Sequence, residues 1–120
     1  VNMSCHEACT KAIAAHANWK ARFRQFMAGE VELDASVVER NDACEFGKWL
    51  ATSSAELPKE HAKAIVDAHT EFHRVAAEVV RAKGAGRTQE AEASLEPSGR
   101  FGKATTALTR SVIAARDAAR

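Results

Sequence analysis

The chain has 120 residues with 17 basic and 16 acidic side chains, a formal net charge of +1, and this length suits a single domain over residues 1–120. The near balance of charge argues against a nucleic-acid-binding protein that relies on a basic surface. No stretch approaches the ~20 consecutive apolar residues of a membrane span and no secretory signal pattern is present, so we expect no direct membrane insertion.

The composition favours helices and a reducing compartment. Alanine supplies 26 residues, whereas there are 6 glycines, 2 prolines and no tyrosine, which is typical of an all-α protein. Three cysteines cannot form a closed disulfide framework, so we expect a cytoplasmic location. The chain begins with Val1 rather than Met, which is compatible with a fragment of a longer protein.

The first predicted element is a helix from about residue 3 to residue 28, and Gly29 follows it as a candidate C-cap. Its apolar seam alternates spacings of four and three residues, as in a helix of a bundle. The seam consists of Cys5, Cys9, Ala12, His16, Trp19, Phe23 and Phe26.

A looser stretch covers residues 30–42, and a short helix is expected over residues 43–51, capped by Asn41 or Asp42. Asp42 has a second possible role, which is to orient a metal-binding imidazole. Within the short element, Gly47 permits a close approach of the backbone.

A third helix is expected over residues 58–83, a fourth segment over 88–95, and a last helix from the interruption at 97–99 to about residue 118. The third helix carries a histidine, His69, on its inner stripe. Long amphipathic helices with short connections predict an antiparallel four-helix bundle, with the short element as an accessory helix that carries Cys44.

Four side chains on three of these elements offer metal ligands. His69 and His73 are four residues apart and project from one side of a helix, while His16 lies on the seam of the first helix and Cys44 begins the short element. One histidine on an apolar face is more often a core residue, and a free cysteine is often buried as a small hydrophobe. Together, however, three imidazoles and one thiolate match tetrahedral Zn²⁺.

These residues resemble the signature of the CZB family, the chemoreceptor zinc-binding domains. The pattern H-x-x-W is present from His16 to Trp19, C-x-x-G-x-W from Cys44 to Trp49, and H-x-x-x-H from His69 to His73. Between these motifs lie 24 and 19 residues, which suits the family. The resemblance implies that His16, Cys44, His69 and His73 are zinc ligands.

The resemblance also implies a role in bacterial signalling. Members of the family accompany the signalling region of a chemoreceptor or a diguanylate cyclase, and no such module is present in these 120 residues. We therefore expect a non-enzymatic sensory domain that answers to zinc, or to an oxidant that attacks the thiolate of Cys44. Its output would come from a fused or partner signalling module, and we expect a homodimer that packs through the first or last helix.

Three alternatives use the same residues. A zinc hydrolase of the H-E-x-x-H type needs a glutamate where this chain has Thr70, and four protein ligands would leave no position for water. A hemerythrin-like di-iron bundle needs more histidines and bridging carboxylates. A structural reading keeps zinc as a permanent staple of a helical interaction module.

Other polar residues carry weaker signals. Cys5 and Cys9 share a helix face but His6 lies roughly 100° away, so seam packing is the better interpretation than a second metal site. His61 precedes His69 by eight residues and is too distant to bind the same ion. Glu71 should face solvent.

Overall fold

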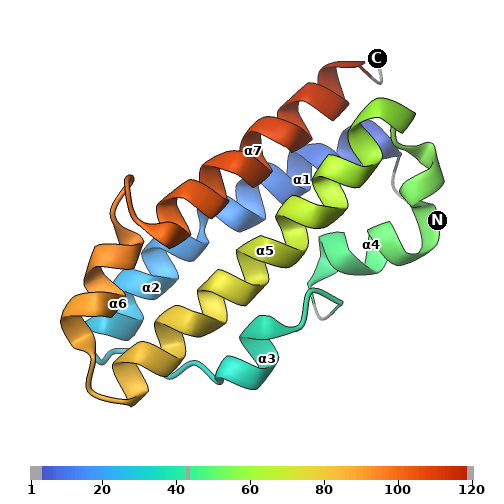
Figure 1. The fold of residues 1–120 in the computed structure, drawn as a ribbon. Coiled ribbons are helices and arrows are strands. Elements are labelled where there is room, and N and C mark those ends of the chain that lie inside the picture. The colour runs from blue at the N-terminus through green and yellow to red at the C-terminus, as the bar shows by residue number, and fades with distance from the viewer. Residues whose placement is uncertain (1–3, 43, 119–120) are drawn as a thin grey trace.

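The N-terminal seam forms two consecutive helices, α1 (Cys5–Ala17) and α2 (Trp19–Met27), in the computed structural model, which describes residues 4–42 and 44–118. Asn18 separates them but keeps right-handed helical dihedral angles, so the two helices continue in one direction (Figure 1). The expected helix start at residue 3 lies outside the described residues. Gly29 ends α2 at φ +79°, as expected, and the Glu30 N–H donates to the Gln25 carbonyl at 2.8 Å.

The remaining elements agree closely with the predicted segments. They are α3 (Ala35–Glu39), α4 (Glu45–Ser53), the 3₁₀ turn η1 (Ser54–Glu56), α5 (Lys59–Gly84), α6 (Thr88–Leu95) and α7 (Arg100–Ala118). No strand occurs in the described ranges. The all-α helical bundle is therefore confirmed.

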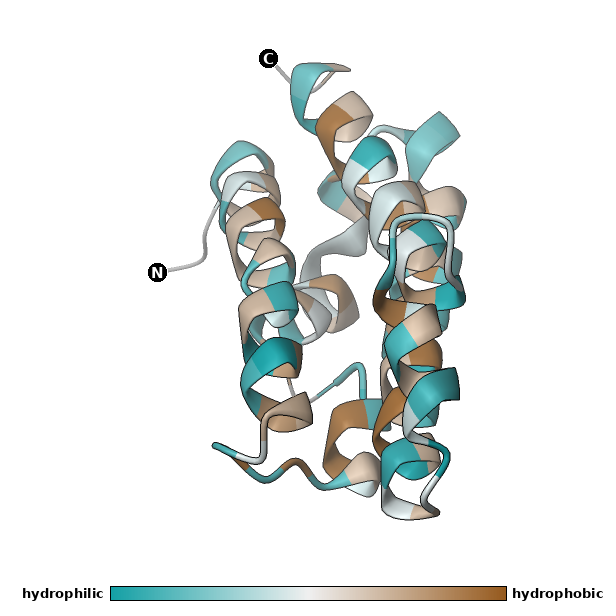
Figure 2. Ribbon diagram, turned by 90° about the vertical axis from the view of Figure 1, so that its left-hand side faces the viewer, coloured by the Kyte–Doolittle hydropathy of each residue, from teal (hydrophilic) through white to brown (hydrophobic). Residues whose placement is uncertain are grey.

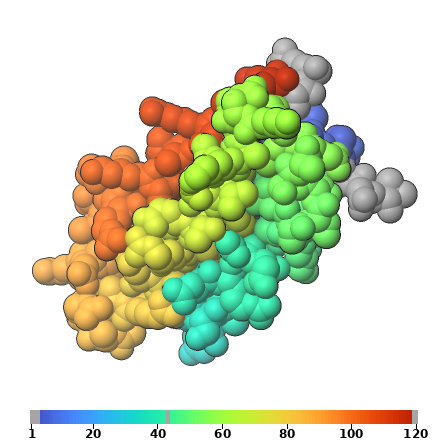
Figure 3. Space-filling view, turned by 45° about the vertical axis from the view of Figure 1, so that its right-hand side comes forward, coloured from blue at the N-terminus to red at the C-terminus, as the bar shows by residue number. Residues whose placement is uncertain are grey.

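The helices surround one core. In Figure 1, α1, α2 and α5 run in the same direction and α7 runs the opposite way against both α1 and α5. Figure 3 shows α3 and α4, in cyan and green, on one face of the molecule; α3 packs along α5, and α4 packs against α1. The two short helices and their connection thus occupy the side of the bundle where a further long helix would otherwise lie.

The core is apolar and its centre is aromatic. The helices carry both hydrophobic and hydrophilic positions (Figure 2), and the large apolar side chains of the core are buried. Phe101 of α7 contacts Phe23 of α2 and Phe72 of α5, with ring centroids 4.9 and 5.3 Å apart. These contacts join α2, α5 and α7 at the centre of the bundle. None of the described helices is long and apolar enough to cross a membrane.

The start of α4 differs from the sequence-based expectation. Neither Asn41 nor Asp42 caps this helix; Cys44 does, because its Sγ accepts a hydrogen bond from the Gly47 N–H at 3.2 Å. Asp42 instead pairs with Arg40 at 3.1 Å, and both side chains are exposed. The sulfur that was expected to bind a metal therefore also stabilises the first turn of α4.

We predict that Gly47→Ala destabilises the protein by about 1–3 kcal/mol, because its Cβ would collide with the backbone carbonyl of Asn41, which has no flexible end to move away. Urea denaturation measures this change. The matched control is Gly84→Ala at the end of α5, where a Cβ meets nothing within 4 Å and the stability should stay the same or rise by up to about 1 kcal/mol. Equal losses in both variants would contradict the collision.

Candidate metal centre

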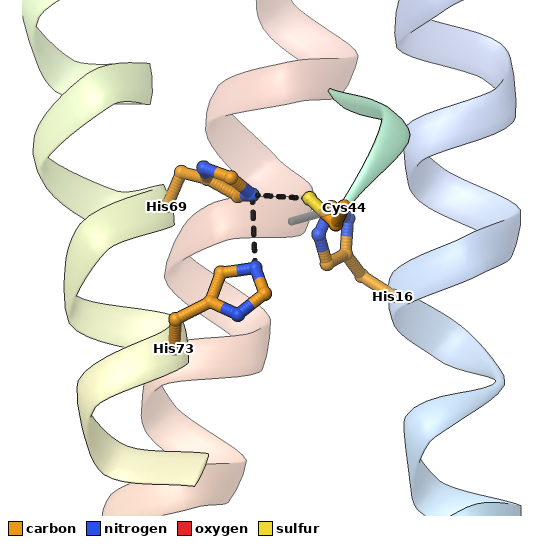
Figure 4. A group of neighbouring side chains, drawn as sticks. All are labelled: His16, Cys44, His69 and His73. Carbon is orange, nitrogen blue, oxygen red and sulfur yellow. Dashed lines mark hydrogen bonds between the residues drawn. The ribbon is translucent and has the colours of Figure 1, made fainter. Parts of the chain in front are cut away.

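The structure brings the four expected ligand side chains together. His16 comes from α1, His69 and His73 from successive turns of α5, and Cys44 from the residue before α4 (Figure 4). One ligand atom of each residue can be chosen so that all four lie within 4.8 Å of one another. The cluster thus joins three parts of the chain that are far apart in sequence.

Backbone carbonyls orient two of the imidazoles. The Nδ1–H of His16 donates to the Ala12 carbonyl at 2.7 Å, and that of His73 donates to the Val38 carbonyl of α3 at 2.9 Å. A carbonyl oxygen only accepts, so Nδ1 carries the proton in both rings and Nε2 presents a lone pair. Both rings are therefore held in the tautomer that a metal ligand needs.

His69 lies between the other two donors. Its Nε2 is 3.1 Å from the His73 Nε2 and 3.2 Å from the Cys44 Sγ (Figure 4). Since the His73 Nε2 has no proton, it accepts this hydrogen bond from the His69 Nε2–H, and a cation bound between the two nitrogens would replace that proton. This contact is consistent with a site built for a positive ion.

Burial keeps the three imidazoles neutral. His16, His69 and His73 are 3%, 1% and 2% exposed. Burial lowers the pKa of His16 to about 4, and burial together with the neighbouring His73 and His16 lowers the pKa of His69 to about 3. The pKa of His73 is also lowered by burial. All three imidazoles are thus uncharged at neutral pH, as metal binding requires.

The pKa of the Cys44 thiol is shifted in two opposite directions by its surroundings. Burial raises the pKa of its thiol, while hydrogen bonds from the backbone N–H groups of Gly47 and Phe46 lower it. A bound cation would add a stronger lowering effect, because a coordinating thiol loses its proton.

The donor set fits zinc. Zn–N bonds of about 2.0–2.1 Å and Zn–S bonds of about 2.3 Å place tetrahedral donors roughly 3.3–3.6 Å apart, close to the contacts of 3.1 and 3.2 Å. All four donors lie within 4.8 Å of one another, so the widest pair needs to close by no more than about 1.2–1.5 Å. Three neutral imidazoles and one thiolate reduce the charge of the buried ion from +2 to +1. If all four donors bind one zinc ion, its tetrahedral coordination is complete without a water molecule.

The other residues that the sequence singled out lie apart from this cluster. Glu71 is on the outside of α5, where its carboxylate binds Arg74 at 2.7 Å. Cys5 and Cys9 are buried in the seam of α1, while the side chain of His6 is exposed. These positions agree with the expectations of a solvent-facing glutamate and of seam packing for the two thiols.

Three supporting contacts were not anticipated. The carbonyls of Ala12 and Val38 hold His16 and His73, and the Asn41 side chain donates to the Thr70 hydroxyl at 2.9 Å, which ties the connection before Cys44 to α5. Every residue has a backbone carbonyl, so its identity carries no signal for the first two contacts. Thr70 lies between the two histidines and is the only one of these groups that the motif itself could have indicated.

We predict that the metal-free protein loses stability as the pH falls below about 6.5. Each buried histidine has a folded-state pKa below the ordinary value of 6.5, so the unfolded chain binds more protons and the free energy of unfolding drops until the folded-state pKa, about 4 for His16, is reached. The slope is up to about 1.4 kcal/mol per pH unit for each imidazole. Urea titrations with a chelator between pH 5 and 7.5 measure it.

His16→Gln should reduce this slope by about a third of its value, since one of three coupled imidazoles is lost. His6→Gln, at an exposed position, should leave it unchanged. A free energy of unfolding that is flat between pH 5 and 6.5 would show that burial does not hold these rings neutral.

Comparison with known protein families gives one match. Residues 16–80 match the family model described as the chemoreceptor zinc-binding domain, CZB. No match was found among curated proteins or among solved structures. The matched segment is more than half of the chain, begins at His16 and includes Cys44, His69 and His73. The chain belongs to the chemoreceptor zinc-binding domain family.

Proposed function

We propose that this chain is a sensory domain of bacterial signalling that binds one zinc ion through His16, Cys44, His69 and His73. The convergence of these four donors within 4.8 Å carries the proposal. Family membership supports it, because the family is one of zinc-binding domains. The stimulus is zinc itself or an oxidant of the Cys44 sulfur, and the domain has no enzymatic activity of its own.

The four residues play unequal parts. His69 and His73 lie one turn apart on α5 and form a rigid pair, whereas His16 and Cys44 approach from other elements. When bound, zinc supplies a cross-link between these elements and keeps the Cys44 sulfur deprotonated. The Val38 carbonyl orients His73, so α3 also supports the site.

Cys44 is the residue through which a chemical event can change the fold. Its sulfur is one of the four donors and also the hydrogen-bond acceptor that caps α4. Oxidation of this sulfur to sulfenic acid weakens its donor strength and its capping bond together. The segment 44–50 then loses both attachments, which moves Phe46 and Trp49, whose rings stack with centroids 6.2 Å apart.

The output lies in a fused or partner signalling module. We propose a cytoplasmic homodimer coupled to a signalling module of the chemoreceptor or diguanylate cyclase type, which reads the changed arrangement of the helices. A mass near 13.0 kDa by light scattering at high micromolar concentration would contradict the dimer.

The structural alternative keeps zinc as a permanent staple, and it uses the same four donors. A hemerythrin-like di-iron centre has less support, since the cluster among the described residues contains no carboxylate to bridge two irons. The first prediction below tests the four donors that the sensor and the staple share, and the second separates the sensor from the staple.

We predict one zinc ion per chain, and His16→Ala should weaken zinc binding by at least about 100-fold and lower the melting temperature, because metal-binding energy is partly folding energy. Competition with a chromophoric chelator and thermal scans measure both quantities. His61→Ala, on α5 outside the cluster, is the control and should bind zinc like the parent. Parental zinc occupancy in His16→Ala would show that α1 contributes no ligand to the site.

We predict that near-stoichiometric hypochlorous acid converts Cys44 to sulfenic acid, releases or loosens zinc and changes tryptophan fluorescence, all reversibly with a thiol reductant. The background is Cys5→Ala with Cys9→Ala, which suits the apolar seam and leaves one thiol. Mass spectrometry with a sulfenic-acid trap locates the modification. Oxidation of Met27 first, with Cys44 unmodified and zinc retained, would leave only the staple.

A further inference from the structure

A pocket of about 290 Å³ lies beside the metal centre, between α1 and the start of α4. Its walls include Ala15 and His16 from α1 and Trp19 from the start of α2, with Cys44 and Phe46 on the other side. The pocket therefore joins the surface of the bundle to two of the four donors.

The pocket gives unequal access to the centre. Cys44 is only partly buried and lines the pocket, as does His16. His69 and His73 are 1% and 2% exposed and do not line it. A small molecule in the pocket thus contacts Cys44 and His16 before it could reach either histidine of α5.

The lining is mainly apolar. Ala8, Ala12 and Ala15 recur on one face of α1 at spacings of four and three, and their small side chains leave the space that Trp19 and Phe46 enclose with aromatic rings. The two charged side chains of the lining, Lys11 and Glu45, are both exposed, which places their charges toward solvent. The interior of the pocket is therefore suited to an apolar group.

The size of the pocket limits what it can hold. It is just below the range of about 300–1,000 Å³ that is typical of drug-sized ligands, which corresponds to a molecule on the order of ten non-hydrogen atoms. Its lining includes the Cys44 sulfur, which accepts a hydrogen bond from the Gly47 N–H and is the nucleophile of the site. This lining therefore matches a ligand in which an apolar group is attached to a group that reacts with sulfur.

We propose that this pocket binds small organic hydroperoxides and presents them to the Cys44 sulfur. The inference rests on the proposed function, in that it names the class of oxidant to which the centre responds. Hydrogen peroxide has no apolar group to pack against Trp19 and Phe46, so the pocket favours the organic peroxide over it.

The reaction is a two-electron oxidation of the thiolate. The sulfur attacks the terminal oxygen of the hydroperoxide, a sulfur–oxygen bond forms, and the oxygen–oxygen bond breaks. The proton of the terminal oxygen passes to the departing alkoxide, so that thiolate and hydroperoxide become sulfenate and alcohol. The hydroperoxide is the oxidant and is itself reduced to the alcohol.

The test measures the rate of Cys44 oxidation in the zinc-loaded protein, on the Cys5→Ala, Cys9→Ala background. Cumene hydroperoxide and hydrogen peroxide are the probes, and the sulfenic acid is trapped with dimedone and quantified by intact mass. Ala15→Trp fills the mouth of the pocket from an exposed position. Ala14→Trp is the matched control, since Ala14 is exposed on the same helix and does not line the pocket.

Cumene hydroperoxide should oxidise Cys44 at least about ten times faster than hydrogen peroxide does. Ala15→Trp should slow the reaction with cumene hydroperoxide at least about tenfold while zinc stoichiometry stays at the parental value, and Ala14→Trp should stay within about twofold of the parent. Ala15→Leu is the smaller substitution if the tryptophan disturbs folding. Equal rates for the two peroxides, or equal rates in the Ala14 and Ala15 variants, would overturn the inference.

Zinc release, followed with a chromophoric indicator, separates this inference from the proposed function. If Cys44 is oxidised with the expected selectivity but zinc and tryptophan fluorescence do not respond, the pocket stands and the oxidant switch fails. If hypochlorous acid releases zinc but the two peroxides and the Ala15 variants show no selectivity, the switch stands and the pocket inference fails.

Discussion

Three imidazoles lie buried in an apolar helical core, and each needs a polar partner that the surrounding apolar side chains do not supply. The fold answers this requirement with backbone carbonyls from α1 and α3 and with the contacts among the donors themselves. No buried side-chain nitrogen or oxygen in the described ranges is left without a partner. The polar centre is therefore what ties the short segments on one side of the bundle to its long helices, because apolar packing alone would accept many arrangements.

Much of this arrangement is readable from the residues. The seam of the first helix predicted the burial of His16, and the spacing of His69 and His73 predicted that both project from one side of α5. Gly29 predicted the end of α2 because a residue with positive φ favours glycine. These features depend on local periodicity or on one residue's backbone preference, which is why the sequence alone suffices for them.

Other features depend on tertiary contacts that no local pattern encodes. Asp42 was a reasonable cap for α4 by residue type, yet Arg40 binds its carboxylate and the Cys44 sulfur accepts the capping bond instead. The Val38 carbonyl supports His73 from a stretch without a clear period, and the pocket beside Cys44 exists only because α1 and α4 pack together. In each case the deciding partner lies elsewhere in the fold.

The spacing of the donors along the chain has a consequence for unfolding. His69 and His73 are brought together by a single turn of α5, whereas His16 and Cys44 reach the centre only when the bundle is assembled. An isolated α5 that forms even transiently can therefore chelate zinc through two imidazoles before the rest of the chain has folded. Because a ligand that also binds the unfolded chain stabilises the native state less, zinc contributes less to stability than its full affinity for the folded centre. The turn of α5 that binds zinc through His69 and His73 also provides a nucleus against which α1 and the Cys44 segment can pack during refolding.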